Sequence, residues 1–227
     1  MKKLVPVLFL VCFGLFAAEV WQKPFAQWSE KDATKVMNSS PWAKSTSISM
    51  DFPGSNQAPL PTGGGGDAGG RGGGPQGEGF GGGGFSVEVT ARIESALPVR
   101  QALVRMRYGA EADKSEEAKK VLSEEPKSYE VVLSGGLGAF VMGPPDAVKQ
   151  RLTESTTLSS PKGAALKPTQ IQIGKPGRTM DVLFVFPRTT PFTVDDQDVE
   201  FATKLGKSNV KLKFRLKDMV VNGKLEM

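Results

Sequence analysis

A glycine-rich stretch divides this sequence and limits which residues can build a folded core. Of the 27 glycines in the 227 residues, 16 lie between Gly54 and Gly84, in runs such as GGGG and RGGG. Such residues carry too little apolar surface to offset the conformational entropy that a chain loses on ordering. We therefore predict a flexible, disordered loop over residues 53–84, so that the core must draw on both flanking parts of the chain.

The first 18 residues have the composition of a secretory signal. Lys2 and Lys3 precede an apolar run from Leu4 to Ala18, which is shorter than the roughly 20 residues that a membrane-spanning helix needs. This pattern predicts a signal peptide over residues 1–18 and an exported protein, periplasmic or extracellular after cleavage near Ala18. Retention of the leader as a short anchor is the alternative, and membrane contact is expected only through this leader.

Two residue types that support much of enzyme chemistry are scarce. The sequence contains no histidine and one cysteine, Cys12, which lies within the predicted leader. Imidazole bases, Ser-His-Asp triads and histidine-ligated metals are therefore excluded. Once the leader is removed, no thiol remains for disulfide or redox chemistry. We accordingly expect no catalytic residues of these kinds, no cofactor and no metal.

Two segments with alternating polar and apolar side chains flank the glycine-rich stretch. Residues 47–52 and 85–94 both have the pattern of half-buried strands. We predict that they pair as an antiparallel hairpin, because the cost of closing a loop rises only slowly with its length. About 180 residues lie outside the leader and the loop, which suffices for one core. The expected organisation is a signal peptide (1–18), an N-terminal helix and first strand (19–52), the loop (53–84) and the remainder of a single domain (85–227).

The remaining pattern predicts a mixed fold. A capping box at Ser29 marks one helix start, and further helices are expected over residues 95–107, 115–123 and 145–153. Short apolar segments separated by turn residues predict strands over 129–133, 169–173, 180–186, 199–203, 209–216 and 224–226. Short connections favour antiparallel neighbours. We therefore expect an α+β fold, a mainly antiparallel single sheet with two to four helices on one face, interrupted by the disordered glycine-rich loop.

The helix predicted over residues 95–107 carries the most specific expectations. Ser95 is expected to cap its start. Apolar residues at positions i, i+4 and i+7 predict a buried stripe made of Val99, Leu103 and Met106. The arginines of the helix, Arg105 among them, are then expected to face solvent. The tryptophans at 28 and 42 are predicted to pack in the core, and an exposed sugar-stacking role is the alternative.

The most basic element is the alternating segment 210–217. Its four cations share one strand face and are candidate ligands for an anionic polysaccharide, lipid or other anionic surface: Lys211, Lys213, Arg215 and Lys217. The alternative is a solvated sheet face, or an edge strand protected by lysines, with Glu88 and Glu94 as cross-strand partners. Nucleic acid is not an expected partner, because the net charge of +5 is modest and no aromatic residue interleaves with these cations.

The densest group of acidic residues is Asp195-Asp196-Gln197-Asp198-Val199-Glu200. Calcium prefers such oxygen ligands, but the glycine and glutamate positions of an EF-hand loop are not matched. We therefore expect a loop leading into a strand rather than a metal site. A pair of carboxylates could also act as acid and base on a polysaccharide, although sequence spacing singles out no pair.

Three segments together resemble a known group of proteins. They are Trp28-Ser29 with Ser40–Lys44 (SPWAK), Ser95–Arg100 (SALPVR) and Leu216–Glu226 (LKDMVVNGKLE). The chain resembles uncharacterised secreted bacterial proteins that share an N-terminal signal and an SPWA-type segment. This resemblance implies export and a similar layout, and it carries no catalytic residues.

These observations favour one function over two others. We expect a secreted or periplasmic, non-enzymatic binding or scaffold domain at the cell envelope, with an envelope protein or an anionic surface as its partner. The alternatives are a carboxylate-dependent hydrolase acting on polysaccharide and an anion-binding module built on segment 210–217. A cleft with two facing carboxylates, one of them buried with a perturbed pKa, would favour the hydrolase.

Overall fold

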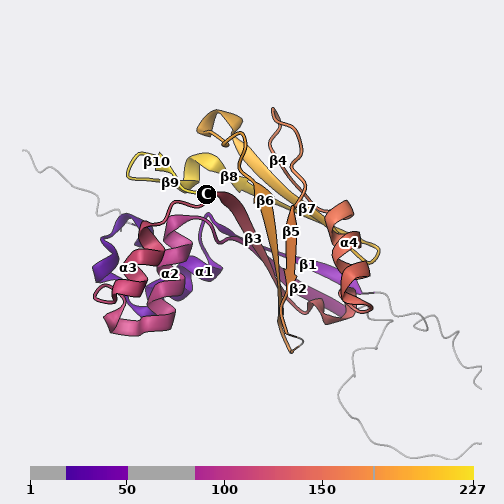
Figure 1. Cartoon of the computed structure of the whole chain (residues 1–227), viewed down its shortest axis with the longest axis horizontal. Coiled ribbons are helices and arrows are strands. Elements are labelled where there is room, and N and C mark those ends of the chain that lie inside the picture. Colours follow the sequence, from indigo (N-terminus) through magenta and orange to yellow (C-terminus); the bar gives the residue numbers. More distant parts are fainter. Residues whose placement is uncertain (1–18, 51–84, 176) are drawn as a thin grey trace, which may run out of the picture.

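The computed structural model of this chain describes residues 19–50, 85–175 and 177–227 (Figure 1). The predicted signal peptide (1–18) and the predicted disordered loop (53–84) lie outside these residues. Among the described residues, no helix has the length and apolar character required to cross a bilayer.

The strands form two principal antiparallel sheets. The larger has the order β1-β2-β3-β6-β5, with β1 Ala43–Met50, β2 Phe85–Ile93, β3 Ser128–Gly135, β6 Met180–Pro187 and β5 Gln170–Ile173. The smaller has the order β4-β7-β8, with β4 Thr157–Ser159, β7 Asp198–Leu205 and β8 Ser208–Arg215, and a short pair joins β9 (Val220–Val221) to β10 (Lys224–Leu225). The α+β class and the antiparallel pairing are confirmed. The prediction of one sheet is wrong, because β4, β7 and β8 form a separate sheet.

The hairpin predicted across the glycine-rich stretch is confirmed. β1 and β2 pair antiparallel, with Ala43 opposite Arg92 and Met50 opposite Phe85. Ser45 and Thr90, opposite each other in this ladder, also join their hydroxyl groups at 2.8 Å. Residues far apart in the sequence thus form the first edge of the larger sheet.

Within the described ranges, four helices accompany the sheets: α1 Glu30–Asn38, α2 Leu97–Tyr108, α3 Glu116–Ser123 and α4 Pro145–Ser155. Figure 1 shows α1, α2 and α3 grouped at one end of the molecule and α4 on the other side, where it packs against β5 and β7. The expectation that the helices share one face is therefore wrong. Short 3-10 turns complete the fold: η1 Val20–Gln22, η2 Phe25–Gln27, η3 Gly109–Glu111, η4 Leu137–Phe140, η5 Val194–Asp196 and η6 Leu216–Met219.

Aromatic side chains fill the space between the two sheets. Phe201 of β7 packs edge-on against Phe184 and Phe186 of β6, with ring centroids 5.3 and 6.4 Å apart. All three side chains are fully buried. Large aromatic rings contribute much of the free energy of burial in such a core, so this contact holds the two sheets together.

The predicted tryptophans both lie in the core. Trp42 is fully buried, packs edge-on against Trp21 at 5.4 Å, and donates its indole N–H to the carbonyl oxygen of Glu226 at 2.7 Å. Trp28 is also buried. Trp42 therefore links the start of β1 to the last residues of the chain.

The start of α1 is formed as the sequence predicts. The Ser29 hydroxyl accepts a hydrogen bond from the Asp32 backbone N–H, and the Asp32 carboxylate accepts one from the Ser29 N–H at 2.9 Å. The hydrogen bond from the Ser29 backbone is the main reason that the pKa of Asp32 lies below its usual value. This reciprocal capping satisfies two donors that a helix start otherwise leaves free.

The helix predicted over residues 95–107 is confirmed as α2, and Val99 is buried and Arg107 exposed as predicted, but the other specific expectations are wrong. Its N-cap is Ala96, and the Ser95 hydroxyl instead accepts a hydrogen bond from the backbone N–H of Glu130 in β3. Leu103 and Met106 are 36% and 53% exposed, whereas Arg105 is only 4% exposed. The helix starts later than predicted and turns its small residues inward. The carbonyl oxygens of Gly109, at the helix end, and of distant Phe25 accept hydrogen bonds from the Arg105 guanidinium inside the fold.

Candidate functional site

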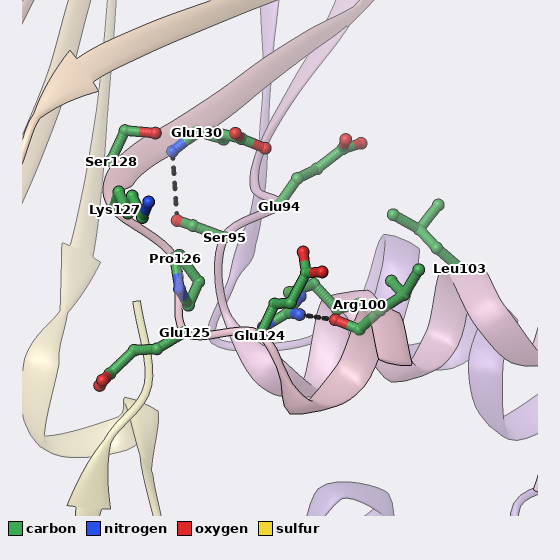
Figure 2. A pocket seen from close by; sticks show the side chains of 11 residues that line it. Glu94, Ser95, Arg100, Leu103, Glu124, Glu125, Pro126, Lys127, Ser128 and Glu130 are labelled. Carbon is green, nitrogen blue, oxygen red and sulfur yellow. Dashed lines mark hydrogen bonds between the residues drawn. The ribbon is translucent and has the colours of Figure 1, made fainter. Parts of the chain in front are cut away.

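A cleft of about 790 Å³ opens where the larger sheet meets the helix group (Figure 2). Three parts of the chain form it: the end of β2, the α2–α3 pair, and the segment that leads from α3 into β3. Its lining residues are Glu94, Ser95, Arg100, Leu103, Val121, Glu124, Glu125, Pro126, Lys127, Ser128 and Glu130. The cleft combines four glutamates with two cations and an apolar wall.

Two hydrogen bonds fix the floor of the cleft. The backbone N–H of Glu94 donates to the carbonyl oxygen of Glu130 at 2.7 Å. The Glu130 N–H in turn donates to the hydroxyl oxygen of Ser95 at 3.2 Å. These bonds join the end of β2 to the start of β3, so two glutamates that are distant in sequence become neighbours.

The carboxylates of the cleft face a common space. Figure 2 shows the carboxylates of Glu94, Glu124 and Glu130 directed toward the same region, with Leu103 on its far side and Glu125 pointing away. Several negative charges that line one cleft favour a cation over an anion. This arrangement is therefore suited to a positively charged group.

Glu94 is the carboxylate of the cleft that is most clearly shielded by its surroundings, with 21% of its side chain accessible and a pKa raised by burial. Burial raises the pKa of Glu94 above its ordinary value, and the charges of Asp181 and Glu130 act in the same direction. The Arg92 guanidinium, 3.5 Å from the Glu94 carboxylate, acts in the opposite direction. Glu94 therefore becomes protonated at a higher pH than an exposed glutamate would.

Arg92 holds Glu94 in place through a chain of polar contacts across the sheet. Its guanidinium donates to the Ser134 hydroxyl at 2.9 Å, and Ser134 donates to the Asp181 carboxylate. These residues belong to β2, β3 and β6. A second hollow of about 830 Å³ lies over this polar sheet face and is lined by Arg92, Ser134 and Arg178 among others.

The remaining walls of the cleft come from the helices. Arg100 of α2 donates to the backbone carbonyl oxygen of Val121 in α3, and so holds the two helices together. Burial lowers the pKa of Arg100, while the negative charge of Glu124 raises it. Leu103 and Val121 expose apolar surface beside this contact. The cleft thus offers carboxylates on one side and aliphatic side chains on the other.

The predicted anion-binding residues lie elsewhere, on the smaller sheet. Lys211, Lys213 and Arg215 are exposed on β8, and Lys217 is exposed in η6. Glu200 lies 3.9 Å from the Lys211 ammonium and 4.0 Å from that of Lys213, while Asp218 lies 3.8 Å from the Arg215 guanidinium. Binding of an anion by these four cations stays a prediction.

The acidic partners predicted for these cations are wrong. Glu88 and Glu94 lie on or just after β2, which pairs with β1 and β3. β8 pairs with β7 instead, and this places Glu200 opposite Lys213. The sequence pattern identifies which residues share a strand face, but it does not identify the neighbouring strand.

The acidic segment 195–200 forms a short turn followed by a strand, as predicted. Asp196 ends η5, where its carboxylate accepts hydrogen bonds from the Thr193 N–H at 2.8 Å and from the Ser160 hydroxyl at 3.0 Å. The bond from the Thr193 backbone is the main reason that its pKa is lowered. Within residues 19–50, 85–175 and 177–227, no group of three or more acidic or sulfur side chains is placed to hold a metal ion.

Sequence reasoning did not find the cleft. The sequence pattern predicted Glu94 only as a partner of the basic segment, and no pattern distinguished Glu124 or Glu130 from other glutamates. What distinguishes them is a tertiary contact, the pairing of Glu94 with Glu130 next to α2. The one local hint is that Ser95 and Pro126 interrupt the pattern at the two strand ends that meet here.

Comparisons with a set of protein-family models, with curated proteins and with solved structures gave no match to this chain.

Proposed function

We propose that this chain is an exported, non-enzymatic binding domain of the cell envelope, and that its cleft takes up a cationic group that is flanked by aliphatic side chains. The leader-like residues 1–18 support export. The observation that carries the binding proposal is the convergence of Glu94, Glu124 and Glu130 in one cleft, opposite an apolar wall (Figure 2).

The chemistry of the cleft indicates a basic peptide segment as the ligand class. A lysine or arginine side chain would place its charge among the three carboxylates. An adjoining leucine-like side chain would cover Leu103 and Val121, which are exposed in the unliganded protein. Charge complementarity supplies specificity and apolar contact supplies affinity, a division seen in many protein interfaces.

Binding of a model peptide tests this proposal. We expect a blocked Leu-Lys-Leu-Lys peptide to bind the full chain and a blocked Leu-Glu-Leu-Glu peptide not to bind. Glu130→Gln removes one carboxylate charge at constant shape, so the Kd for the lysine peptide should rise about tenfold. Isothermal titration calorimetry measures both values.

A matched control is available on α3. Glu116→Gln changes the same chemistry at an exposed position outside the cleft, and its Kd should equal that of the unmodified protein. Equal binding of the acidic peptide, or an unchanged Kd in Glu130→Gln, would contradict the proposal.

The pKa of Glu94 predicts how this binding depends on pH. Because burial raises that pKa above the ordinary value of 4.5, acidification should neutralise Glu94 earlier than other glutamates, and affinity for the lysine peptide should begin to fall above pH 4.5. In Glu94→Gln the remaining pH dependence should shift to lower pH. Calorimetric titrations at several pH values, with a ¹³C NMR titration of the Glu94 carboxyl carbon, provide the measurement.

The raised pKa of Glu94 makes folding stability depend on pH in the opposite direction from peptide binding. A raised pKa means that the folded protein binds the Glu94 proton more tightly than the unfolded chain does. The stability contributed by Glu94 is therefore present below its unfolded pKa and is lost as pH rises through the folded value. A Glu94 titration at or below pH 4.5 would remove the basis of both expectations.

One observation favours a second candidate, a carboxylate-dependent hydrolase acting on polysaccharide. Glu94, with its raised pKa, adjoins Glu130 in the same cleft, and glycosidases pair a protonated acid with an ionised carboxylate in this way. Assays of reducing-end release from soluble polysaccharides decide between the candidates. Release that Glu94→Gln and Glu130→Gln each abolish would establish the hydrolase, and no release from any substrate leaves binding as the function.

A further inference from the structure

A short loop, residues 141–144, joins η4 to α4, and α4 lies at the other end of the molecule from α2 and α3, which contribute to the acidic cleft (Figure 1). Met142 is 72% exposed, the largest exposed fraction among the large apolar side chains of the described residues. Gly143, Pro144 and Pro145 follow it and are also exposed, whereas Phe140 and Val141 before it are half-buried and pack against the core. A continuous exposed apolar segment is uncommon on a soluble surface and marks a contact site.

The loop is held in its exposed position by contacts at its base. Leu137 is fully buried at the start of η4. Arg151 of α4 donates to the Phe140 carbonyl oxygen at 2.8 Å, and the Phe140 ring lies against Gly206 in the β7–β8 turn. Gly143 has a φ of +117°, a conformation that side-chain-bearing residues rarely adopt. These features fix the turn that places Met142 outward.

Cations lie on both sides of the loop. A cavity of about 430 Å³ on one side is lined by Met142, Arg151 and Lys204 among others. A cavity of about 460 Å³ on the other side is lined by Val141, Pro145 and Lys149 among others. No carboxylate lines either cavity, although Asp146 follows the loop in the first turn of α4.

We propose that residues 142–145 insert into the interface of an anionic membrane, with Met142 reaching the acyl boundary and Lys149, Arg151 and Lys204 contacting headgroup phosphates. In interfacial membrane contacts, apolar residues enter the headgroup region while neighbouring basic residues bind the anionic phosphates. Pro144 and Pro145 carry no N–H, so the loop has fewer backbone donors that would lose water on insertion. Membrane contact was expected only through the leader, and this would be a second contact, made by the folded domain.

A lipid surface fits this region better than a protein partner does. The apolar segment is a short, convex loop, whereas a stable protein interface needs about 800 Å² on each partner. The flanking cavities place positive charge beside the apolar tip, which matches the arrangement of an anionic headgroup above an acyl chain. The inference does not depend on what the acidic cleft binds.

A fluorophore on the loop tests the proposal in the full chain without interference from the leader. In a Cys12→Ser background, Ala139→Cys carries an environment-sensitive nitrobenzoxadiazole label. Vesicles of phosphatidylglycerol should raise its emission about threefold and shift it to the blue, whereas phosphatidylcholine vesicles should change it little. The control places the label at Lys120→Cys on α3, at the other end of the molecule, where it should stay in water even when the leader binds the vesicle.

Two further variants separate the apolar and the electrostatic contributions. Met142→Asp should abolish the emission change at position 139. Lys149→Glu with Lys204→Glu should raise the lipid concentration needed for half-maximal change by at least about tenfold, since each cation near such a surface contributes about fivefold. The proposal would be overturned if the emission change were the same in these variants as in the unmodified loop, or the same with both lipids. An emission change that appears without vesicles as the protein concentration rises would also overturn it, and would indicate self-association.

Discussion

Trp42→Ala is expected to lower the free energy of unfolding by about 3–5 kcal/mol, enough to leave a domain of ordinary stability barely folded. The side chain is fully buried and packs edge-on against Trp21. Its removal leaves a cavity and also frees the Glu226 carbonyl oxygen, which accepts the indole N–H at 2.7 Å. Urea unfolding followed by far-ultraviolet circular dichroism measures the change, because fluorescence would be altered by the substitution itself.

Two variants divide this effect into its parts. Trp42→Phe retains a ring but removes the donor to Glu226. The lost hydrogen bond should lower the free energy of unfolding by about 1–2 kcal/mol, in addition to the effect of the smaller ring. Met106→Ala truncates an exposed apolar side chain on α2 and should change stability by less than about 0.5 kcal/mol. Unfolding of Trp42→Ala at the same urea concentration as the unmodified protein would show that this residue does not connect β1 to the C-terminal segment in solution.

Arg105→Met is expected to cost about 2–4 kcal/mol, although the substitution places an apolar side chain in a buried site. The guanidinium donates to the carbonyl oxygens of Gly109 at 2.8 Å and Phe25 at 3.0 Å, and it lies 4.7 Å from the centre of the Phe25 ring. Methionine fills part of the volume but removes both hydrogen bonds, the contact with the Phe25 ring and the ion pair with Asp113 at 3.8 Å, although each carbonyl oxygen keeps a backbone N–H donor. The measurement is the urea midpoint, supplemented by amide hydrogen exchange at Gln27 and Trp28, where loss of the contact should increase local opening.

The neighbouring arginine provides the control for this substitution. Arg107 lies on the same helix but faces solvent, so Arg107→Met should cost less than about 1 kcal/mol and leave exchange at Trp28 unchanged. Equal effects of the two substitutions would mean that Arg105 is solvated in the native protein. Its importance would then have to be sought outside these carbonyl contacts.

The sequence predicted the local elements of this fold well, because local physical chemistry determines them. The Ser29–Asp32 capping box and the alternation of residues 85–94 each require only neighbouring residues. Val148 and Leu152, four residues apart on α4, are both buried as their spacing indicates. Even the long β1–β2 connection could be anticipated, since loop closure depends weakly on length.

Features that depend on contacts between distant segments could not be predicted. Arg105 is buried because Phe25, 80 residues earlier, offers it a carbonyl oxygen. The cleft exists because Glu94 and Glu130 meet at adjoining strand ends. A periodic pattern identifies a buried face, but it contains no information about which other element covers that face.

The β1–β2 ladder has a consequence for how quickly the protein folds. Met50 pairs with Phe85 although 34 residues separate them in the sequence, so these two positions must meet before β2 can serve as a template for β1. Compared with a hairpin closed by a few residues, this adds about 2 kcal/mol of closure entropy. The pairs β3–β6 and β7–β8 also differ in the length of the chain that connects their strands, since only β7 and β8 are joined by a short turn. We therefore expect nucleation to begin in β7–β8 and the first strand to dock late, which gives the domain a higher contact order than its many short turns suggest.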